Sequence, residues 1–168
     1  MTTQTFMQVE LSPQLFSRIA TKQDLSLLVS FINQAFKDEN PFITESRTNM
    51  EEIAHFLEIG HFLLIEEEGE TSGVIYAEIR KEGRGYLGLL VVNPKNRRSG
   101  MGKQLIHAGE QFCKQHGCRL IEGSVMNLRP DLLERYKRYG FRVVGEIAGV
   151  HRDRVDRDYS LILIEKDL

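Results

Sequence analysis

A short turn near the middle of the chain constrains the fold more than any other feature. An apolar stretch from Tyr86 to Val92 runs into Pro94, and a helical pattern begins at Gly100. Proline cannot donate to a strand's hydrogen-bonding ladder, and glycines such as Gly100 and Gly102 let the backbone come close to a ligand. The sequence therefore predicts a strand, a tight turn and a helix with an accessible N-terminus.

The same turn is rich in positive charge. Four cationic residues and no acid lie within nine positions, namely Lys95, Arg97, Arg98 and Lys103. Unpaired N–H groups at a helix N-terminus bind anions, and the helix dipole favours negative charge there. Together these features suit a pyrophosphate, although glycines at this spacing could also serve only to pack a helix tightly.

Two other phosphate-binding patterns fit less well. A P-loop requires Ser or Thr after its Gly-Lys pair, to hold Mg²⁺, whereas Gly102-Lys103 is followed by Gln104. A dinucleotide-binding fold begins with the glycine turn and places an acid about 20 residues later. Glu122 has that spacing, but three antiparallel-looking strands precede the turn, which is not how such a fold starts.

Hydrophobic periodicity predicts the remaining elements. We expect a strand at 18–20, a helix capped by Thr21 and ending at 38–41, and a second helix at 49–57. Further strands are expected at 62–65, 74–79, 86–92, 120–125, 141–144 and 159–164, and further helices at 100–117 and 130–140. The acidic segment 66–70 is predicted to be a solvated hairpin tip.

This order predicts an α/β (α+β) fold with a mixed, mostly antiparallel sheet flanked by helices. The length of 168 residues suits one domain, 1–168, with residues 1–15 as a loose tail. The net charge of −2 argues against a nucleic-acid partner. No apolar run is long enough to cross a bilayer, and the N-terminus has no secretory pattern, so we expect a cytoplasmic monomer or homodimer without a membrane partner.

The two cysteines, Cys113 and Cys118, flank His116 near the end of a predicted helix. A structural metal site needs further Cys or His ligands, and the sequence holds no second cluster that supplies them. We therefore predict two reduced thiols and no metal.

Three segments together resemble one protein family. The pattern Leu90-x-Val92-x-Pro94-x-x-Arg97-x-x-Gly100-x-Gly102-x-x-Leu105 resembles the signature turn of the GNAT family of N-acetyltransferases. Arg18-Ile19-Ala20-Thr21-x-x-Asp24 resembles the family's opening strand and helix. Leu133-x-x-Tyr136-x-x-x-Gly140-Phe141 resembles its second landmark, and the element order matches from about Arg18 to Leu168.

The resemblance implies acetyl-CoA, or another acyl-CoA, bound where two neighbouring strands splay apart. Backbone groups at Leu90, Val91 and Val92 would hold the pantetheine. The turn would hold the pyrophosphate through Arg97, Arg98, Ser99, Gly100, Met101, Gly102 and Lys103. It also implies direct acetyl transfer to a primary amine in a ternary complex, without a metal, and Tyr136 matches the residue that protonates or hydrogen-bonds the leaving thiolate.

Three positions depart from the family pattern. Many relatives carry a glutamate base six residues before the proline, where this chain has Gly88, so the general base is unassigned. Glu78 on the preceding strand is a possible substitute, although a surface or salt-bridge role fits it better. Arg98 replaces a common glycine, and Asn127 lies nine residues before Tyr136, where the family's asparagine lies seven before.

The acceptor remains open between a small molecule and a peptide amine. Five residues from the first two helices and their connection could line its site: Phe31, Phe36, Asn40, Phe42 and Arg47. The segment 151–158 alternates in charge and reads as a solvated loop, or as one flank of the acceptor site. Two rival functions stay in view: a non-catalytic acyl-CoA-binding or interaction module, and an ATP-dependent phosphotransferase that uses the same turn.

Overall fold

The computed structural model describes residues 15–168, apart from the side chains of Asp38, Glu39 and Arg152. The expected N-terminal tail lies outside the described residues except for residue 15. The strands are β1 (Arg18–Ile19), β2 (His61–Glu67), β3 (Glu70–Ile79), β4 (Arg84–Val92), β5 (Leu120–Met126), β6 (Arg142–Ala148) and β7 (Ser160–Asp167). The helices are α1 (Leu25–Glu39), α2 (Met50–Ile59), α3 (Met101–Gln115) and α4 (Pro130–Arg138), with 3₁₀ turns η1 (Lys22–Asp24), η2 (Pro94–Asn96) and η3 (Arg152–Arg154).

The described strands form one seven-stranded sheet in the order β1-β2-β3-β4-β5-β7-β6. Only β4 and β5 pair in parallel, and every other pair of neighbours is antiparallel. The predicted mixed, mostly antiparallel α/β fold is therefore confirmed, as is the predicted order of its elements.

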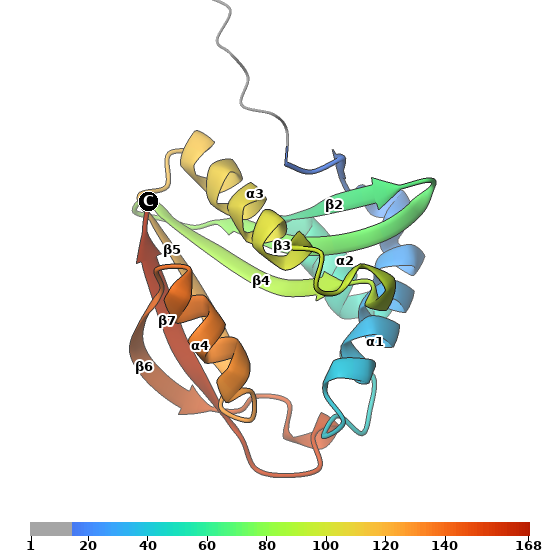
Figure 1. Ribbon diagram of the computed structural model, residues 1–168, viewed down its shortest axis with the longest axis vertical. Helices are drawn as coiled ribbons and strands as arrows, with labels where there is room; N and C mark the ends of the chain where they lie inside the picture. The colour runs from blue at the N-terminus through green and yellow to red at the C-terminus, as the bar shows by residue number, and fades with distance from the viewer. Residues whose placement is uncertain (1–14) are drawn as a thin grey trace, which may run out of the picture.

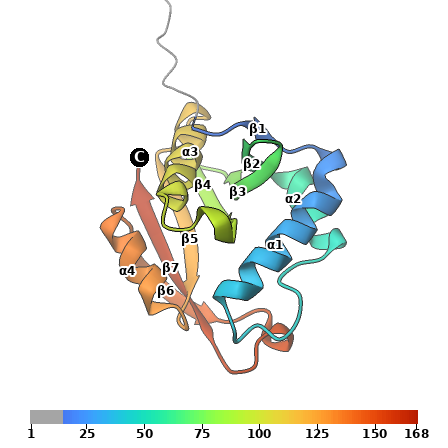
Figure 2. The same cartoon turned by 45° about the vertical axis from the view of Figure 1, so that its right-hand side comes forward.

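Helices cover both faces of the sheet, with α3 and α4 on one face and α1 and α2 on the other (Figures 1 and 2). The core has a corresponding division. Leu87 and Leu105 belong to the cluster under α3 and α4, whereas Leu28 and Val91 belong to the cluster under α1 and α2. Burial of apolar side chains from both faces supplies the main stabilising term of such a fold.

Two predicted boundaries were wrong by a few residues. The acidic segment is strand except at its tip, where Glu68 and Gly69 have left-handed φ values of 52° and 78°. Positive φ at both central residues is the geometry of a tight two-residue hairpin, and Glu67 pairs with Glu70 across it. At the other boundary, α1 continues through residues 38 and 39 and ends at Asn40, which is its C-cap.

The ends of the later helices follow their glycines, as predicted. Gly117 after α3 and Gly140 after α4 have φ values of 86° and 97°. Next to each glycine, an amide reaches back to close the last turn, from Cys118 to the Cys113 carbonyl at 3.0 Å and from Phe141 to the Tyr136 carbonyl at 3.1 Å. These contacts satisfy carbonyls that a helix end otherwise leaves without partners.

The strand that leads into the turn is interrupted by a bulge. Residues 89 and 90 of β4 lie opposite the single residue Ile75 of β3, because the pairing jumps from Tyr76↔Gly88 to Val74↔Val91. Leu89 takes up the extra residue with a φ of 45°. A bulge bends its strand and leaves a residue outside the ladder, and here it lies where β4 leaves β5.

Candidate functional site

The central feature of the site is the divergence of β4 from β5. The two strands pair only from Arg84↔Leu120 to Tyr86↔Glu122, although both continue for several residues, and Figure 1 shows them opening like a V. Backbone groups that would pair in a closed sheet therefore face a cleft. A cavity of about 150 Å³ occupies this cleft, lined by residues 86–90 of β4 and 122–126 of β5.

The strand β4, which forms one wall of the cleft, is followed by the turn before α3. Gly100 caps this helix in the left-handed region, with a φ of 82°, and no side chain caps the first-turn amides. A Cβ added at Gly100 or at Gly102 would have no atom within 4 Å. The space in front of the helix is therefore open, and its first amides have no acceptor within the helix.

The predicted cofactor residues take different places around this turn. Leu90, Val91 and Val92 end β4, and Arg97, Arg98 and Ser99 lie between η2 and α3. Arg98 and Lys103 are exposed, whereas the side chain of Met101 is buried in the core. Arg97 donates from Nη2 to the carbonyl of Ala35 at 2.9 Å, so it ties the turn to α1.

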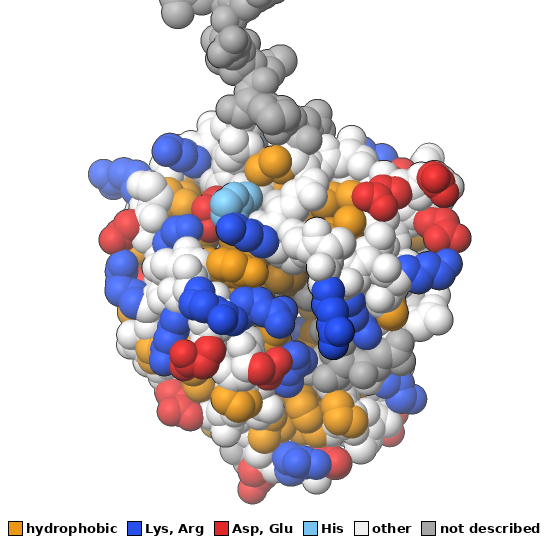
Figure 3. Space-filling view, in the orientation of Figure 1, with side chains coloured by type: hydrophobic (Ala, Val, Ile, Leu, Met, Phe, Trp, Pro, Cys, Tyr) orange, Lys and Arg blue, Asp and Glu red, His pale blue; other side chains and the backbone are white. Residues whose placement is uncertain are grey.

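Positive charge gathers on the same side of the molecule. Figure 3 shows Lys and Arg side chains across the middle of this face, around the hollow between α4 and the turn. Arg98 and Lys103 are exposed within the turn, and α4 carries Arg135, Lys137 and Arg138 in its last turn. Such a field attracts an anionic ligand.

Tyr136 lies on the opposite wall of the cleft. It is half-buried on α4 and lines the cavity, and its ring packs edge-on against Phe141 at a centroid distance of 5.7 Å. Burial raises the pKa of Tyr136 to about 12, because the phenolate would lose its hydration. The hydroxyl is therefore protonated at neutral pH and available as a donor.

The place of the usual family glutamate is occupied by a neighbouring ring. A Cβ added at Gly88 would lie 2.9 Å from the hydroxyl oxygen of Tyr86, and Tyr86 lines the cavity. Its ring packs under the guanidinium of Arg80, at 4.3 Å from the centroid. Alternate residues of a strand share a face, so this spacing was a usable signal that the sequence reasoning missed.

Glu78, the possible substitute base, is held in polar contacts beside the cavity. It accepts from the Tyr76 hydroxyl at 2.8 Å and pairs with Arg80 at 3.1 Å, and it is not among the lining residues. The salt-bridge role favoured for Glu78 is thus confirmed.

Asn127 also has a local partner. Its side-chain oxygen accepts from the Ser160 amide at 2.9 Å, at the end of the β5–β7 pair.

The wide end of the cleft contains three of the five predicted acceptor residues. Phe36, Asn40 and Arg47 line the cavity, whereas Phe31 lines a separate pocket beside α1 and Phe42 is buried. Asn40 accepts from Nη1 of Arg129 at 2.7 Å and donates to the Phe36 carbonyl at 2.8 Å. This contact joins the α1 end of the cleft to the start of α4.

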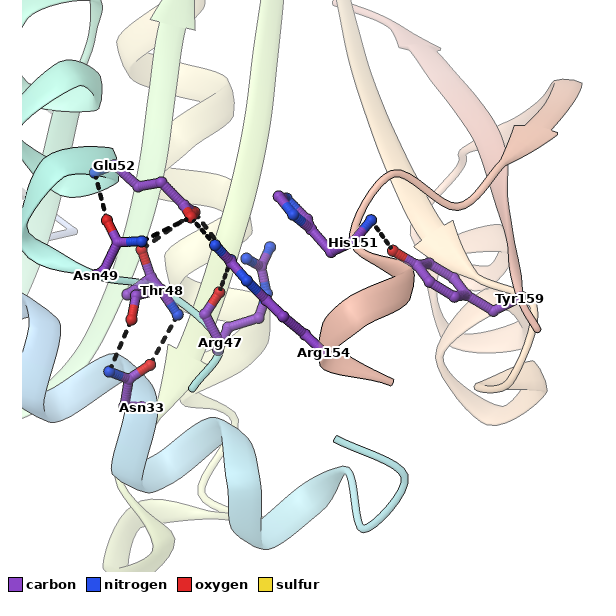
Figure 4. Close-up of polar contacts among 8 residues, drawn as sticks. All are labelled: Asn33, Arg47, Thr48, Asn49, Glu52, His151, Arg154 and Tyr159. Carbon is purple, nitrogen blue, oxygen red and sulfur yellow. Dashed lines mark hydrogen bonds and ion pairs between the residues drawn. The ribbon is translucent and has the colours of Figure 1, made fainter. Parts of the chain in front are cut away.

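Two loops that are distant in sequence close this wide end. The segment 151–158 packs on the α1–α2 connection through Thr44, whose amide donates to the Arg154 carbonyl at 3.0 Å. Arg154 also forms an ion pair with Glu52 and donates to the Arg47 carbonyl at 2.8 Å (Figure 4). One charge of this alternating segment, Arg154, is therefore held by an ion pair with Glu52. No local sequence pattern indicates this pair, because the two residues are 102 positions apart.

A family model described as an acetyltransferase (GNAT) domain matches residues 18–153. The chain belongs to the GNAT acetyltransferase family. This match covers β1 through β6, and therefore includes the turn, α4 and the β4 and β5 walls of the cleft. The predicted family is confirmed.

Solved structures of other GNAT proteins share the fold. A ribosomal-protein-alanine N-acetyltransferase from Brucella melitensis is 20% identical, with a TM-score of 0.72 over 90% of this chain and 98% of that chain. An IAA acetyltransferase from Bacillus cereus is 18% identical, with a TM-score of 0.68 over 90% and 97%. A GNAT acetyltransferase from Elizabethkingia anophelis, solved with acetyl-CoA bound, is 19% identical, with a TM-score of 0.65 over 75% and 86%. No match was found among the curated proteins.

Three further observations concern the described residues. Among the side chains that the structure describes, no group of three or more His, Cys, Asp or Glu is placed to hold a metal ion. Within residues 15–168, no helix is long and apolar enough to span a membrane. Cys113 and Cys118 are buried free thiols, and burial raises the pKa of Cys113 to about 12.

Proposed function

We propose that this GNAT protein transfers an acetyl group from acetyl-CoA directly to a primary amine. The observation that carries the proposal is the succession of two features along one strand: β4 lines the cavity beside β5 and is followed by the open, uncapped N-terminus of α3. An elongated ligand with an anionic middle and an apolar arm suits this combination.

The residues present fit acetyl-CoA. Open space before Gly100 and Gly102 admits a phosphate to the amides of the first helical turn, and Arg98 and Lys103 supply exposed charge beside it. Backbone groups at Leu90 and Val92, on the strand edge that β5 leaves unpaired, are suited to an amide-containing pantetheine arm. Met101 contributes through its backbone alone, because its side chain is in the core.

Acetyl-CoA supplies the acetyl group as a thioester, whose C–S bond breaks as the amide C–N bond forms. Tyr136 would then donate a hydrogen bond from Oη to the sulfur. Its pKa of about 12 exceeds the ~8.5 of a thiol, so full proton transfer from Tyr136 would be uphill by about 5 kcal/mol. Hydrogen bonding to the thiolate, rather than protonation, is the role that this difference favours.

Two further tasks fall to other groups. An amide on β4 between Leu90 and Val92 is the candidate donor to the carbonyl oxygen, where negative charge develops. The amine must also lose a proton before or during attack. Gly88 offers no carboxylate, and Tyr86 occupies the space beside it, so we propose that the acceptor binds as the free amine or passes its proton to water.

The test is release of CoA thiol from acetyl-CoA in the presence of a broad panel of primary amines. We expect release with at least one amine, and Tyr136→Phe should reduce kcat by roughly 10- to 100-fold, the effect of one hydrogen bond to a charged group. The affinity of this variant for acetyl-CoA should stay unchanged. The phenylalanine ring of the variant is the same size as the tyrosine ring of the wild type, so both proteins should pack against Phe141 in the same way.

Rival functions predict different outcomes. A non-catalytic acyl-CoA-binding module would bind acetyl-CoA but release no thiol with any amine. An ATP-dependent phosphotransferase would bind Mg-ATP in preference to CoA. Either result would contradict the proposal.

A further inference from the structure

Arg47 is the cavity-lining cation that the proposed chemistry leaves without a role. It lies in the connection between α1 and α2 and lines the same cavity as Tyr136. Among the described side chains, which do not include those of residues 38 and 39, no carboxylate forms an ion pair with its guanidinium. In contrast, Arg129, the other arginine of the lining, pairs with Asp131 at 2.9 Å.

The charge of Glu52 acts on Arg47, but the oxygens of this carboxylate are already in use. Glu52 forms an ion pair with Arg154 through both of its oxygens. It also accepts from Thr48 Oγ1 and Asn49 Nδ2, each at 3.4 Å. Figure 4 shows this carboxylate held between Arg154 and the start of α2. At the narrow end of the cavity, Glu122 pairs with Arg80 and Arg84.

The side chain of Arg47 is also held in place. Its guanidinium lies over the ring of Phe36, at 5.2 Å from the centroid, and its carbonyl accepts from Arg154 at 2.8 Å. The backbone of the next residue, Thr48, forms two hydrogen bonds with the side chain of Asn33. The Thr48 amide donates to Oδ1 at 2.8 Å, and the Thr48 carbonyl accepts from Nδ2 at 3.0 Å. A positioned cation loses little entropy when it binds a ligand.

The environment disfavours an uncompensated charge at this position. Burial lowers the pKa of Arg47 from its ordinary value. The negative charge of Glu52 opposes part of this shift, whereas the positive charge of Arg154 acts in the same direction as burial. An arginine nevertheless keeps its proton in proteins. An anion that enters the cavity would therefore bind a guanidinium that is already partly desolvated, which strengthens the attraction.

We propose that Arg47 binds a carboxylate of the acceptor, so that the substrate is an amine bearing a carboxylate. This inference rests on the proposed acetyl transfer. A single guanidinium without a paired carboxylate can be neutralised by one negative charge. Its planar geometry also allows two parallel hydrogen bonds to a carboxylate. A doubly charged phosphate would call for a second cation, and Arg154 is committed to Glu52. Amino acids and peptides with an acidic residue beside the N-terminus share this chemistry.

The first arm of the experiment measures binding directly. In ¹⁵N spectra, the Nε–H signal of Arg47 is identified as the one missing from Arg47→Met. Free amino acids, their amides, and short peptides with Asp or Asn at the second position are then titrated into the CoA-bound protein. We expect a saturable shift of this signal with carboxylate-bearing ligands and not with the matched amides. The ligand series that shifts it, amino acid or peptide, identifies the source.

The second arm measures thiol release with the same matched pairs. Wild type should prefer the carboxylate member by at least about tenfold in kcat/KM. Arg47→Met should remove that preference by raising the acceptor KM, with the KM for acetyl-CoA unchanged, and Arg47→Lys should restore part of it. Arg142→Met is the matched control, since Arg142 is an exposed arginine of β6 that pairs with Glu165 and Asp167 outside the cavity, and it should keep the preference.

Failure of the inference and failure of the proposed function are distinguishable. If acetyl-CoA binds and neutral amines react, but Arg47→Met keeps the carboxylate preference or wild type has none, only the inference is overturned. If no ligand of the panel shifts the Arg47 signal, the inference is likewise overturned. Absence of acetyl-CoA binding would instead contradict the proposed function.

Discussion

At the scale of single residues, Gly100 combines two properties that a side chain would remove. Its left-handed φ of 82° turns the chain into α3, and the absence of a side chain leaves the first amides of the helix accessible. Glycine adopts this conformation without steric cost. The predicted phosphate site therefore depends on the backbone at this one position more than on any single cation around it.

Gly100→Asp should abolish the proposed pyrophosphate site. The carboxylate would place bulk and negative charge at the helix N-terminus, and we expect the affinity for acetyl-CoA to fall by at least about 100-fold, measured by calorimetry. Gly69→Asp is a matched control, since Gly69 has a φ of 78° and equally open surroundings in the distant β2–β3 hairpin. Unchanged affinity in folded Gly100→Asp would refute the assignment.

The pKa of Tyr136 makes a separate prediction about pH. Because burial raises this pKa to about 12, the phenol stays protonated below that pH and is lost as a donor only above it. We therefore expect kcat/KM to rise with pH as the acceptor amine loses its proton, with no decline from Tyr136 up to about pH 10.5. A pH profile of thiol release that falls with an apparent pKa near 10 would contradict this role.

At the scale of elements, β1 and η1 are joined by a polar cluster rather than by core packing alone. Asp24 accepts two hydrogen bonds from Arg18 of β1, both at 2.8 Å, and one from the Thr21 amide at 2.8 Å. The last contact belongs to a capping box at the start of η1. These donors, above all Arg18, lower the pKa of Asp24 to about 2.

Asp24→Asn should lower the free energy of unfolding by about 2 kcal/mol at pH 7. The folded pKa of about 2 lies below the unfolded value of 3.8, so the contribution is present above pH 4 and is lost as pH falls toward 2. Urea unfolding of both proteins from pH 7 to pH 3 measures it. Asp156→Asn, which breaks the exposed pair with Arg157, should change little. A difference between wild type and Asp24→Asn that grows as pH falls would contradict this account.

Elements with a clear local period were predictable, and irregular ones were not. The spacing of Met101, Leu105, Ala108 and Phe112 predicted α3. As expected, all four side chains lie on the buried face of this helix. The bulge in β4 left no such trace. It places Leu89 in the left-handed region, where glycine or asparagine would have been the recognisable signal, so the run Leu89-Leu90-Val91-Val92 reads as an uninterrupted strand.

At the scale of the whole molecule, the site depends on contacts between distant segments. The turn and its cations were visible in the sequence because these residues are close together along the chain. The wide end of the cleft was not, because it is assembled from Glu52, Arg154 and the isolated bridge Ile43↔Val155. Such pairings have no local period, and only the folded sheet brings the α1–α2 connection against the β6–β7 loop.

Ligand binding at this cleft should stabilise the entire fold, because the ligand contacts both halves of the diverging sheet. With acetyl-CoA at about 100 times its Kd, the stabilisation is about 2.7 kcal/mol, which raises Tm by roughly 5–10 °C for a chain of this size. Differential scanning fluorimetry measures the shift. Mg-ATP at the same concentration should give none, and an equal shift with ATP would contradict the assignment to CoA.

The most direct test of the central claim is a crystal structure of the protein with acetyl-CoA. We expect the pyrophosphate at the amides that follow Gly100, and the pantetheine arm between β4 and β5 with its sulfur near the Tyr136 hydroxyl. Acetyl-CoA bound elsewhere on the surface, with the cleft between β4 and β5 empty, would contradict the account.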